Sequence, residues 1–407
     1  MRYIGPGIIW AMSAIGQTHV VLSTYAGARF GFDLLWMVVL AHVLTYPVFE
    51  FGARYAIATG HSLNHAYLGM LGVRWIAVPF LGFMVLAVPF LLVASLGSVT
   101  ASILLAAFPS VGFATWAGVI AVGTAALLFG GHYRWLERLN LAMASILLVG
   151  VAIAFGLEPP EGGALTAGLL PAIPAGALVT LVAMMRLPSD AGSSILLSAW
   201  ALERRDAAPE DSPAEAMRGI LFGLRCGYAL SLGVSFVFLS LGATVLRPRG
   251  VDLEGVDLAL QLSRVFTETV GAWTFPLFIL IAFVALFSGY YAAADGVPRV
   301  LEDLVRRIRG GDGGGWMSRL RGIHAVLLLA GGFAITIGLE RPAFLVLLAV
   351  SVGLVGYPLI YGLNLFAVLR MIPPEFRPHP FTLAVAGMGV LFAMTGTVLL
   401  VVTRVLA

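Results

Sequence analysis

The sequence predicts an all-α protein that crosses a membrane many times, and three observations support this prediction. Of its 407 residues, 60% are hydrophobic and only 11% are charged, whereas soluble domains have about 25% charged residues. The mean hydropathy is +0.97. Apolar runs long enough to cross about 30 Å of hydrocarbon recur along the whole chain. Most residues of these apolar runs are therefore expected to lie within the lipid bilayer.

Eleven apolar stretches separated by polar breaks are expected to form the spans. They lie at residues 4–25, 33–58, 75–107, 112–131, 138–156, 169–201, 217–246, 269–299, 322–339, 342–370 and 380–405. Two connections, residues 202–218 and 300–321, are rich in charge, with eight charged residues each. The first stretch is not expected to be a cleaved signal peptide, because polar residues interrupt its centre.

The placement of arginine predicts the orientation of the chain. With the N-terminus in the cytoplasm, fifteen arginines fall on the cytoplasmic side and six on the opposite side. We therefore expect an integral protein of a prokaryotic-type inner membrane, with its C-terminus outside. The arginine-rich segment 306–321 is interpreted as a determinant of this topology, with a site for anionic lipid or a partner as the alternative. The pI near 9.2 follows from the same bias and does not indicate a nucleic-acid partner.

Two of the predicted helices are interrupted by polar residues. The first contains AIGQTH (residues 14–19), and the sixth contains RLPSDAGSS (residues 186–194). Proline removes a backbone donor and breaks a helix, and the freed groups must be buried in protein or line a cavity. The alternative is two ordinary kinks with packed polar side chains.

The two interruptions come at equivalent places in two sets of five helices. Residues 1–157 are expected to form the first repeat, residues 165–371 the second, and residues 379–407 an eleventh helix. Paired broken helices of this kind indicate a transporter with inverted repeats, whose substrate lies between them near the bilayer midplane.

The segment GPGIIWAMSAIGQTHVVLSTYAGARFGFDLLWMVVLAHVL, followed by ARYAIATGHSL, resembles the opening of the Nramp (SLC11) metal-transporter family. The resemblance covers residues 5–62 well and continues more weakly through LPSDAGSSILLSA and LFSGYYAAADGVPRVLED. It implies a leucine-transporter-like fold of eleven or twelve helices. It also implies the transport of divalent transition metals together with protons.

Several positions depart from the pattern of that family. Where its first helix has Asp-Pro-Gly-Asn, residues 16–19 are Gly-Gln-Thr-His, and where its sixth has Met-Pro-His-Asn, residues 187–190 are Leu-Pro-Ser-Asp. The thioether that favours transition metals is thereby lost. A further histidine of the family is replaced by Ser194, and a glutamine of its tenth helix by Gly356. The chain therefore resembles an outlying branch.

The interruptions and the resemblance together define the candidate substrate-binding residues. They are Gly16, Gln17, His19, Met184, Arg186, Leu187, Ser189, Asp190, Ser193, Ser194 and Gly356. The expected metal ligands among them are Gln17, His19, Asp190 and the backbone carbonyl of Met184. Carboxylate, amide, hydroxyl and carbonyl oxygens suit a partly hydrated hard cation such as Mg²⁺ or Mn²⁺, although His19 alone favours softer metals.

The charges near the sixth interruption leave two interpretations open. Asp190 is an intramembrane carboxylate, and such a residue indicates a functional site; its alternative is an ion pair with Arg186, four residues earlier. The guanidinium of Arg186 stays charged. Either it points away from the substrate, or the substrate is a small anion or polar solute held by Arg186 and the half-helix N-termini.

Proton coupling is expected to be weak or absent. Serines, Ser95 and Ser98, occupy the places where the resembling family has an acidic pair on a proton route. Free histidine titrates near neutrality, which makes His19 a candidate proton carrier; the alternative is a hydrogen-bonded packing residue. His42 and Glu50 lie eight residues apart on one predicted helix, where they form either an internal polar contact or an alternative proton route.

These observations predict a secondary or facilitative transporter that works by alternating access. Its expected substrate is Mg²⁺ or Mn²⁺, and the alternative is a small anion or polar solute.

The sequence contains no nucleotide-binding loop and no HExxH motif, so we expect neither an enzyme nor a cofactor. The single cysteine, Cys226, excludes an internal disulfide and a cysteine-rich metal site. The lipid bilayer is the expected surroundings, and the oligomeric state is open, with a monomer allowed.

Overall fold

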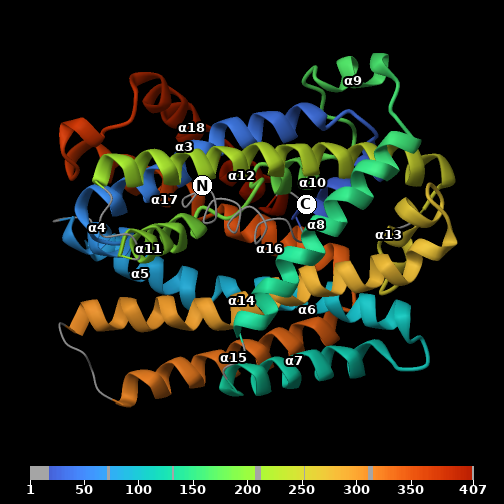
Figure 1. Cartoon of the computed structure of the whole chain (residues 1–407), viewed down its shortest axis with the longest axis horizontal. Helices are drawn as coiled ribbons and strands as arrows, with labels where there is room; N and C mark the ends of the chain where they lie inside the picture. Colours follow the sequence, from blue (N-terminus) through green and yellow to red (C-terminus); the bar gives the residue numbers. More distant parts are fainter. Residues whose placement is uncertain are drawn as a thin grey trace.

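The structure is a computed structural model, and it describes residues 18–70, 74–130, 133–206, 212–251, 253–309 and 315–405. Every regular element within these ranges is a helix (Figure 1). The predicted all-α class is therefore confirmed. Gly16 and Gln17 lie outside the described residues.

The helices follow the order of the predicted spans. Those of the first half are η1 (Thr18–Ser23), α2 (Thr24–Phe30), α3 (Leu35–Thr59), α4 (Leu63–Gly69), α5 (Arg74–Leu86), α6 (Val88–Ala107), α7 (Phe113–Gly130), α8 (Tyr133–Leu157) and α9 (Gly162–Gly168). The second half contains α10 (Leu178–Met184), α11 (Ser193–Asp206), α12 (Pro213–Leu241), η2 (Gly242–Leu246), η3 (Arg247–Arg249), α13 (Leu258–Thr267), η4 (Ala272–Thr274), α14 (Phe275–Arg309), α15 (Gly315–Leu339), α16 (Pro342–Leu354), α17 (Tyr357–Arg370), η5 (Pro374–Phe376) and α18 (Pro380–Val405).

Long apolar helices dominate the described ranges. By length and hydropathy, seven of them can cross a membrane, or up to nine if each of two bent pairs counts as one span. The bent pairs are the end of α8 with α9, at 116°, and α16 with α17, at 43°. The bend between α16 and α17 was not expected from the sequence. The count of eleven spans and the division into two five-helix repeats stay predictions.

Several predicted boundaries differ from the ends of the observed helices. The sixth helix was expected from residue 169, but α10 begins only at Leu178. Pro171 and Pro174 precede it, and Gly176 has a φ of +77°, a left-handed conformation that ends regular helix.

The charged connections are also more helical than expected. α14 continues to Arg309, and an i,i+4 ion pair between Glu302 and Arg306, 2.9 Å apart, supports its extension. α12 begins at Pro213 rather than residue 217, because Ser212 and Glu215 form a reciprocal capping box.

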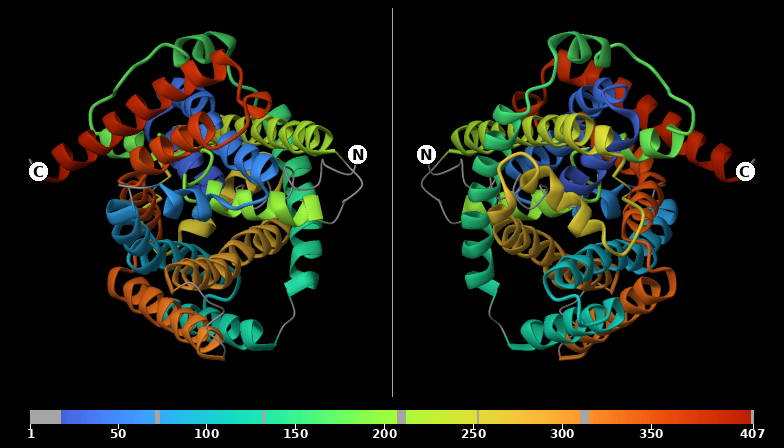
Figure 2. Two further views of the ribbon diagram at one scale, coloured as in Figure 1. Left: turned by 90° about the vertical axis from the view of Figure 1, so that its left-hand side faces the viewer. Right: turned by 90° about the vertical axis from the view of Figure 1, so that its right-hand side faces the viewer.

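Two helices organise the packing of the chain. α3 packs against α11, α12, α17 and α18, whereas α6 packs against α7, α14, α15 and α16. η1 and α10 lie between these groups: η1 contacts α10, α12 and α16, and α10 contacts α3, α16 and α18. Figures 1 and 2 show the short central segments enclosed by the long helices. η1 and α10, which belong to the first and sixth predicted helices, therefore meet in the interior.

A glycine pair brings the backbones of α2 and the α12–η2 junction together. A Cβ added to Gly27 would lie 2.0 Å from the carbonyl oxygen of Leu239, and one added to Gly242 would lie 2.3 Å from that of Thr24. Small residues permit this close approach between helices in a membrane, where packing rather than hydrophobicity drives association. The contact holds the helix that follows η1 against the second half of the chain.

We expect Gly242→Ala to destabilise the protein, because the new methyl group would meet backbone that no rotamer change can move. Overpacking costs roughly 1–3 kcal/mol, and sometimes more. Gly233→Ala, in the same region of α12, is the matched control, because nothing lies within 4 Å of a Cβ there. Thermal melting in detergent is the measurement. Equal melting temperatures for the two variants would contradict the close contact.

Candidate functional site

The sixth predicted helix is interrupted where the sequence indicated. α10 ends at Met184 and α11 begins at Ser193, and the peptide between Leu187 and Pro188 is cis. Side chains from three other elements hold the carbonyl groups of this interruption. The bonds are Thr18 Oγ1 to Pro188 O at 3.3 Å, Thr45 Oγ1 to Leu187 O at 3.0 Å and Tyr357 OH to Ser189 O at 3.0 Å. The backbone groups freed by the break are thus satisfied inside the protein.

Arg186 and Asp190 form an ion pair at this interruption. The guanidinium Nη2 lies 2.9 Å from the Asp190 Oδ2, and the Oδ1 accepts a hydrogen bond of 2.8 Å from the backbone of Gly192. Arg186 is only 5% exposed, whereas the Asp190 side chain is 31% exposed. The pair that the sequence left as an alternative is therefore present, and the charges of the two groups cancel.

The guanidinium of Arg186 points toward α16. Its Nη1 donates to the carbonyl oxygens of Ala349 and Val350, at 2.9 and 3.1 Å. Gly353 makes room for it, because a Cβ there would lie 2.3 Å from the same nitrogen. Arg186 thus reaches another helix while it stays paired with Asp190.

A second polar cluster links the first predicted helix to α3 and α12. The Nε2 atoms of His19 and His42 lie 2.6 and 2.9 Å from the same hydroxyl, that of Ser231. The Nδ1 of His42 lies 2.7 Å from the carbonyl oxygen of Val38. A carbonyl only accepts, so this nitrogen donates, and in the neutral ring Nε2 accepts from Ser231. All three side chains are buried.

The residues proposed for a proton or polar route have separate partners. Glu50 pairs with Arg54 at 2.6 Å rather than with His42, and Arg54 also donates to the carbonyl of Phe376 at 3.0 Å. The expected polar contact between Glu50 and His42 is thus replaced by two separate interactions.

The two serines of α6 are both buried. Ser95 donates to the carbonyl of Leu92 at 2.8 Å. The hydroxyl of Ser98 has no hydrogen-bond partner within the described part of the chain. Neither side chain can ionise, so the structure places no carboxylate at these positions.

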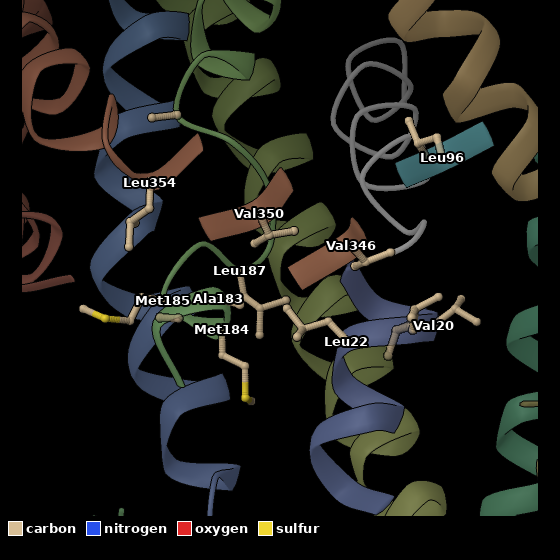
Figure 3. Close-up of a cluster of buried hydrophobic side chains, with 14 of the residues drawn as sticks. Val20, Leu22, Leu96, Ala183, Met184, Met185, Leu187, Val346, Val350 and Leu354 are labelled. Carbon is tan, nitrogen blue, oxygen red and sulfur yellow. The ribbon is translucent and has the colours of Figure 1, made fainter. Parts of the chain in front are cut away.

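Several other candidate residues take part in packing. The side chains of Met184 and Leu187 lie in an apolar cluster with Leu22 (Figure 3), and the carbonyl of Met184 accepts from the backbone of Leu187 at 3.0 Å. A Cβ at Gly356 would lie 2.7 Å from the side chain of Met84 on α5.

Ser194 is also held within the interior. Its hydroxyl donates to the carbonyl of Ala191 at 2.6 Å and accepts from Asn364 at 3.0 Å.

The polar groups that remain partly exposed at the interruption are few. They belong to Thr18, Ser189, Asp190 and Ser193, and the hydroxyls of Ser189 and Ser193 lie 3.3 Å apart. Within the described ranges, no group of three or more His, Cys, Asp and Glu side chains could hold a metal ion. A cation bound here would instead meet hydroxyl oxygens, one carboxylate and water.

Four residues that were not among the predicted candidates also shape this site. Thr45, Ser231, Gly353 and Tyr357 each hold or make room for one of its groups. Three of them are polar residues inside apolar stretches, which is a usable signal, because a polar side chain within a membrane helix requires an internal partner. Gly353 carries no such signal.

Comparison with known proteins identifies the family. The profile described as natural resistance-associated macrophage protein-like, or Nramp, matches residues 7–403. The chain belongs to the Nramp family. It is 30% identical to an uncharacterized protein of Pasteurella multocida, over 75% of this chain and 71% of that one. It is 26% identical to the divalent metal cation transporter MntH of Chromohalobacter salexigens, over 69% of this chain and 66% of that one.

Solved structures show the fold of this Nramp chain. The manganese transporter of Eremococcus coleocola superposes with a TM-score of 0.71 at 18% identity, covering 98% of this chain and 85% of that one. Mhp1, a nucleobase-cation-symport-1 family transporter, superposes with a TM-score of 0.61 at 14% identity, covering 98% and 90%. The expected leucine-transporter-like fold is confirmed. The Nramp chain is an integral membrane protein, and its family supports the expectation that it is not an enzyme.

We expect Ser231→Ala to destabilise the protein, because it removes the hydroxyl that both imidazoles contact. Loss of a partner for buried polar groups costs roughly 1–3 kcal/mol. Ser235→Ala is the matched control on the same helix, since the Ser235 hydroxyl is buried and has no hydrogen-bond partner among the described residues. The melting temperature of Ser235→Ala should equal that of the wild type or exceed it. If both variants melt alike, the His19–Ser231–His42 bridge contributes nothing to stability.

Proposed function

We propose that this Nramp protein moves a divalent metal cation across the membrane by alternating access. The substrate would lie between η1 and the interruption that separates α10 from α11. The observation that carries the proposal is the Asp190 carboxylate, which is partly exposed at that interruption. The Thr18 hydroxyl of η1, bonded to the Pro188 carbonyl, brings the first predicted helix to the same place. The divalent metal and manganese transporters among the relatives support the same substrate class.

The available donors favour Mg²⁺ or Mn²⁺ over softer metals. Hydroxyl oxygens of Ser189 and Ser193 stand beside the carboxylate, and the Met184 thioether is buried in the apolar cluster of Figure 3. Mg²⁺ usually keeps several waters and binds through one or two carboxylates. Asp190 supplies one such carboxylate, and the neighbouring hydroxyls can bind the waters of the ion. Gln17, His19 and the Met184 carbonyl stay proposed ligands.

Transport of a small anion through Arg186 is less well supported. The guanidinium already donates to Asp190 and to two carbonyl groups of α16. It is also buried, so an anion would have to displace internal acceptors to reach it.

We further propose weak or absent proton coupling. α6 contains no ionisable side chain, and Ser95 and Ser98 stand where the resemblance places carboxylates. The proposed setting is an inner membrane with the N-terminus in the cytoplasm, as the arginine distribution indicates.

Uptake by proteoliposomes tests the proposal. The protein would be supplied with Mg²⁺, Mn²⁺ and a panel of small anions while the internal pH is recorded. We expect saturable uptake of the metals with little proton movement. If no metal is taken up, and an anion is taken up by the wild type but not by Arg186→Ala, the substrate is an anion rather than a cation.

Asp190→Ala should reduce metal uptake at least tenfold, because it removes the one exposed carboxylate of the site; a tenfold change in affinity is about 1.4 kcal/mol. Asp295→Ala is the matched control. Asp295 also pairs with an arginine four residues away, at 2.9 Å, and its side chain is 26% exposed. Uptake by Asp190→Ala at the control rate would show that the substrate binds elsewhere.

A further inference from the structure

Three oxygen acceptors converge on the guanidinium of Arg186. They are the carbonyl oxygens of Ala349 and Val350 and the Oδ2 of Asp190, at distances between 2.9 and 3.1 Å. The group they surround is almost completely buried. Such a set of carbonyls and one carboxylate around a single positive charge has the composition of a site for a monovalent cation.

The helix ends around this point add to the negative potential. α10 ends at Met184, two residues before Arg186, and α16 ends at Leu354, in the turn that follows Ala349 and Val350. The C-terminal end of a helix carries a partial negative charge that favours a cation. In transporters with discontinuous helices, such ends and unwound carbonyls coordinate the coupling Na⁺ or H⁺.

We propose that Ala349 O, Val350 O and the Asp190 carboxylate form a monovalent-cation site whose occupant is the Arg186 side chain. The protein thus carries its own cation, and the transport cycle requires no Na⁺ or proton from solution at this point. The inference rests on the proposed transport function and specifies how that function is driven: the metal moves down its own electrochemical gradient.

Arginine is suited to this role for two reasons. Its guanidinium remains protonated at any physiological pH and presents several donors in a planar fork. It is also covalently attached, so it cannot leave with the substrate. Gly353 permits the arrangement, because any side chain there would overlap the guanidinium.

An arginine that only stabilises the fold would make the same contacts, so the test must ask whether the vacated site takes a soluble cation. Arg186→Ala leaves the two carbonyls and the carboxylate in place. We expect its metal uptake in choline buffer to fall at least tenfold, a loss of about 1.4 kcal/mol, and to recover several-fold when millimolar guanidinium chloride is added. Na⁺ should give a smaller recovery. Wild-type uptake should respond to neither ion.

Thermal melting provides a readout that does not depend on transport. Guanidinium at the same concentration should raise the melting temperature of Arg186→Ala. Guanidinium should not raise the melting temperature of the double variant Arg186→Ala/Asp190→Ala, which lacks the carboxylate. It should not raise the melting temperature of Arg299→Ala either, because Arg299 pairs with Asp295 at an exposed position and its removal leaves no enclosed site. Arg186→Gln serves in the same assays if Arg186→Ala does not fold.

Gly353→Ala tests the geometry from the opposite side. The new methyl group would push the guanidinium away from α16, so we expect a lower melting temperature and slower uptake, with no recovery in guanidinium because the arginine still blocks the site. Gly362→Ala on α17, where nothing lies within 4 Å of a Cβ, is the control. Wild-type behaviour of Gly353→Ala would show that contact with the α16 carbonyls is dispensable.

The outcomes separate the two proposals. Absence of recovery and of a melting shift in Arg186→Ala would overturn the cation-site inference. Metal uptake by the wild type that depends on Na⁺ or moves protons would also overturn the cation-site inference, but it would leave the proposal of metal transport intact. If the wild type takes up no metal, the transport proposal fails, and the melting experiment still decides the inference.

Discussion

The interruption of the sixth predicted helix depends on the contact between Arg186 and α16. Eight residues, 185–192, lie outside regular helix between α10 and α11, in a region of the chain where lipid offers no hydrogen-bond partners. Such a segment persists only if the protein satisfies its backbone and its charges. Thr18, Thr45 and Tyr357 bind its carbonyl groups, and the carbonyls of α16 and the Asp190 carboxylate surround its one positive charge.

This contact also sets the electrostatics available to a substrate. A carboxylate beside a permanent cation presents almost no net charge, so a dication bound there gains less Coulomb energy than at an unpaired carboxylate. The partly exposed oxygens of Asp190, Ser189 and Ser193 can still order the waters of a hydrated ion. Arg186 also joins the sixth interruption to α16, shortly before the bend between α16 and α17.

The polar groups of this Nramp chain differ in kind from those that the resemblance implies. Hydroxyls replace carboxylates at Ser95 and Ser98, and the buried histidines His19 and His42 meet at Ser231. A hydroxyl is far less expensive to bury than a carboxylate, because it carries no charge to desolvate. The chain therefore combines the family fold with hydroxyls at the two positions where the resemblance implies carboxylates.

The sequence by itself determined the membrane setting, the helical class, the family and the place of the sixth interruption, because hydropathy, proline and glycine act on the chain within a few residues. It did not determine the bend between α16 and α17 or the late start of α10 at Leu178. Only the tertiary structure decided which carbonyls of α16 bind Arg186, because these lie 163 and 164 residues further along the chain. The same holds for the contact between His19 and Ser231, which are 212 residues apart. Local spacing carries no information about such distant contacts, whereas packing of α3, α10, α12 and α16 around one interior fixes them.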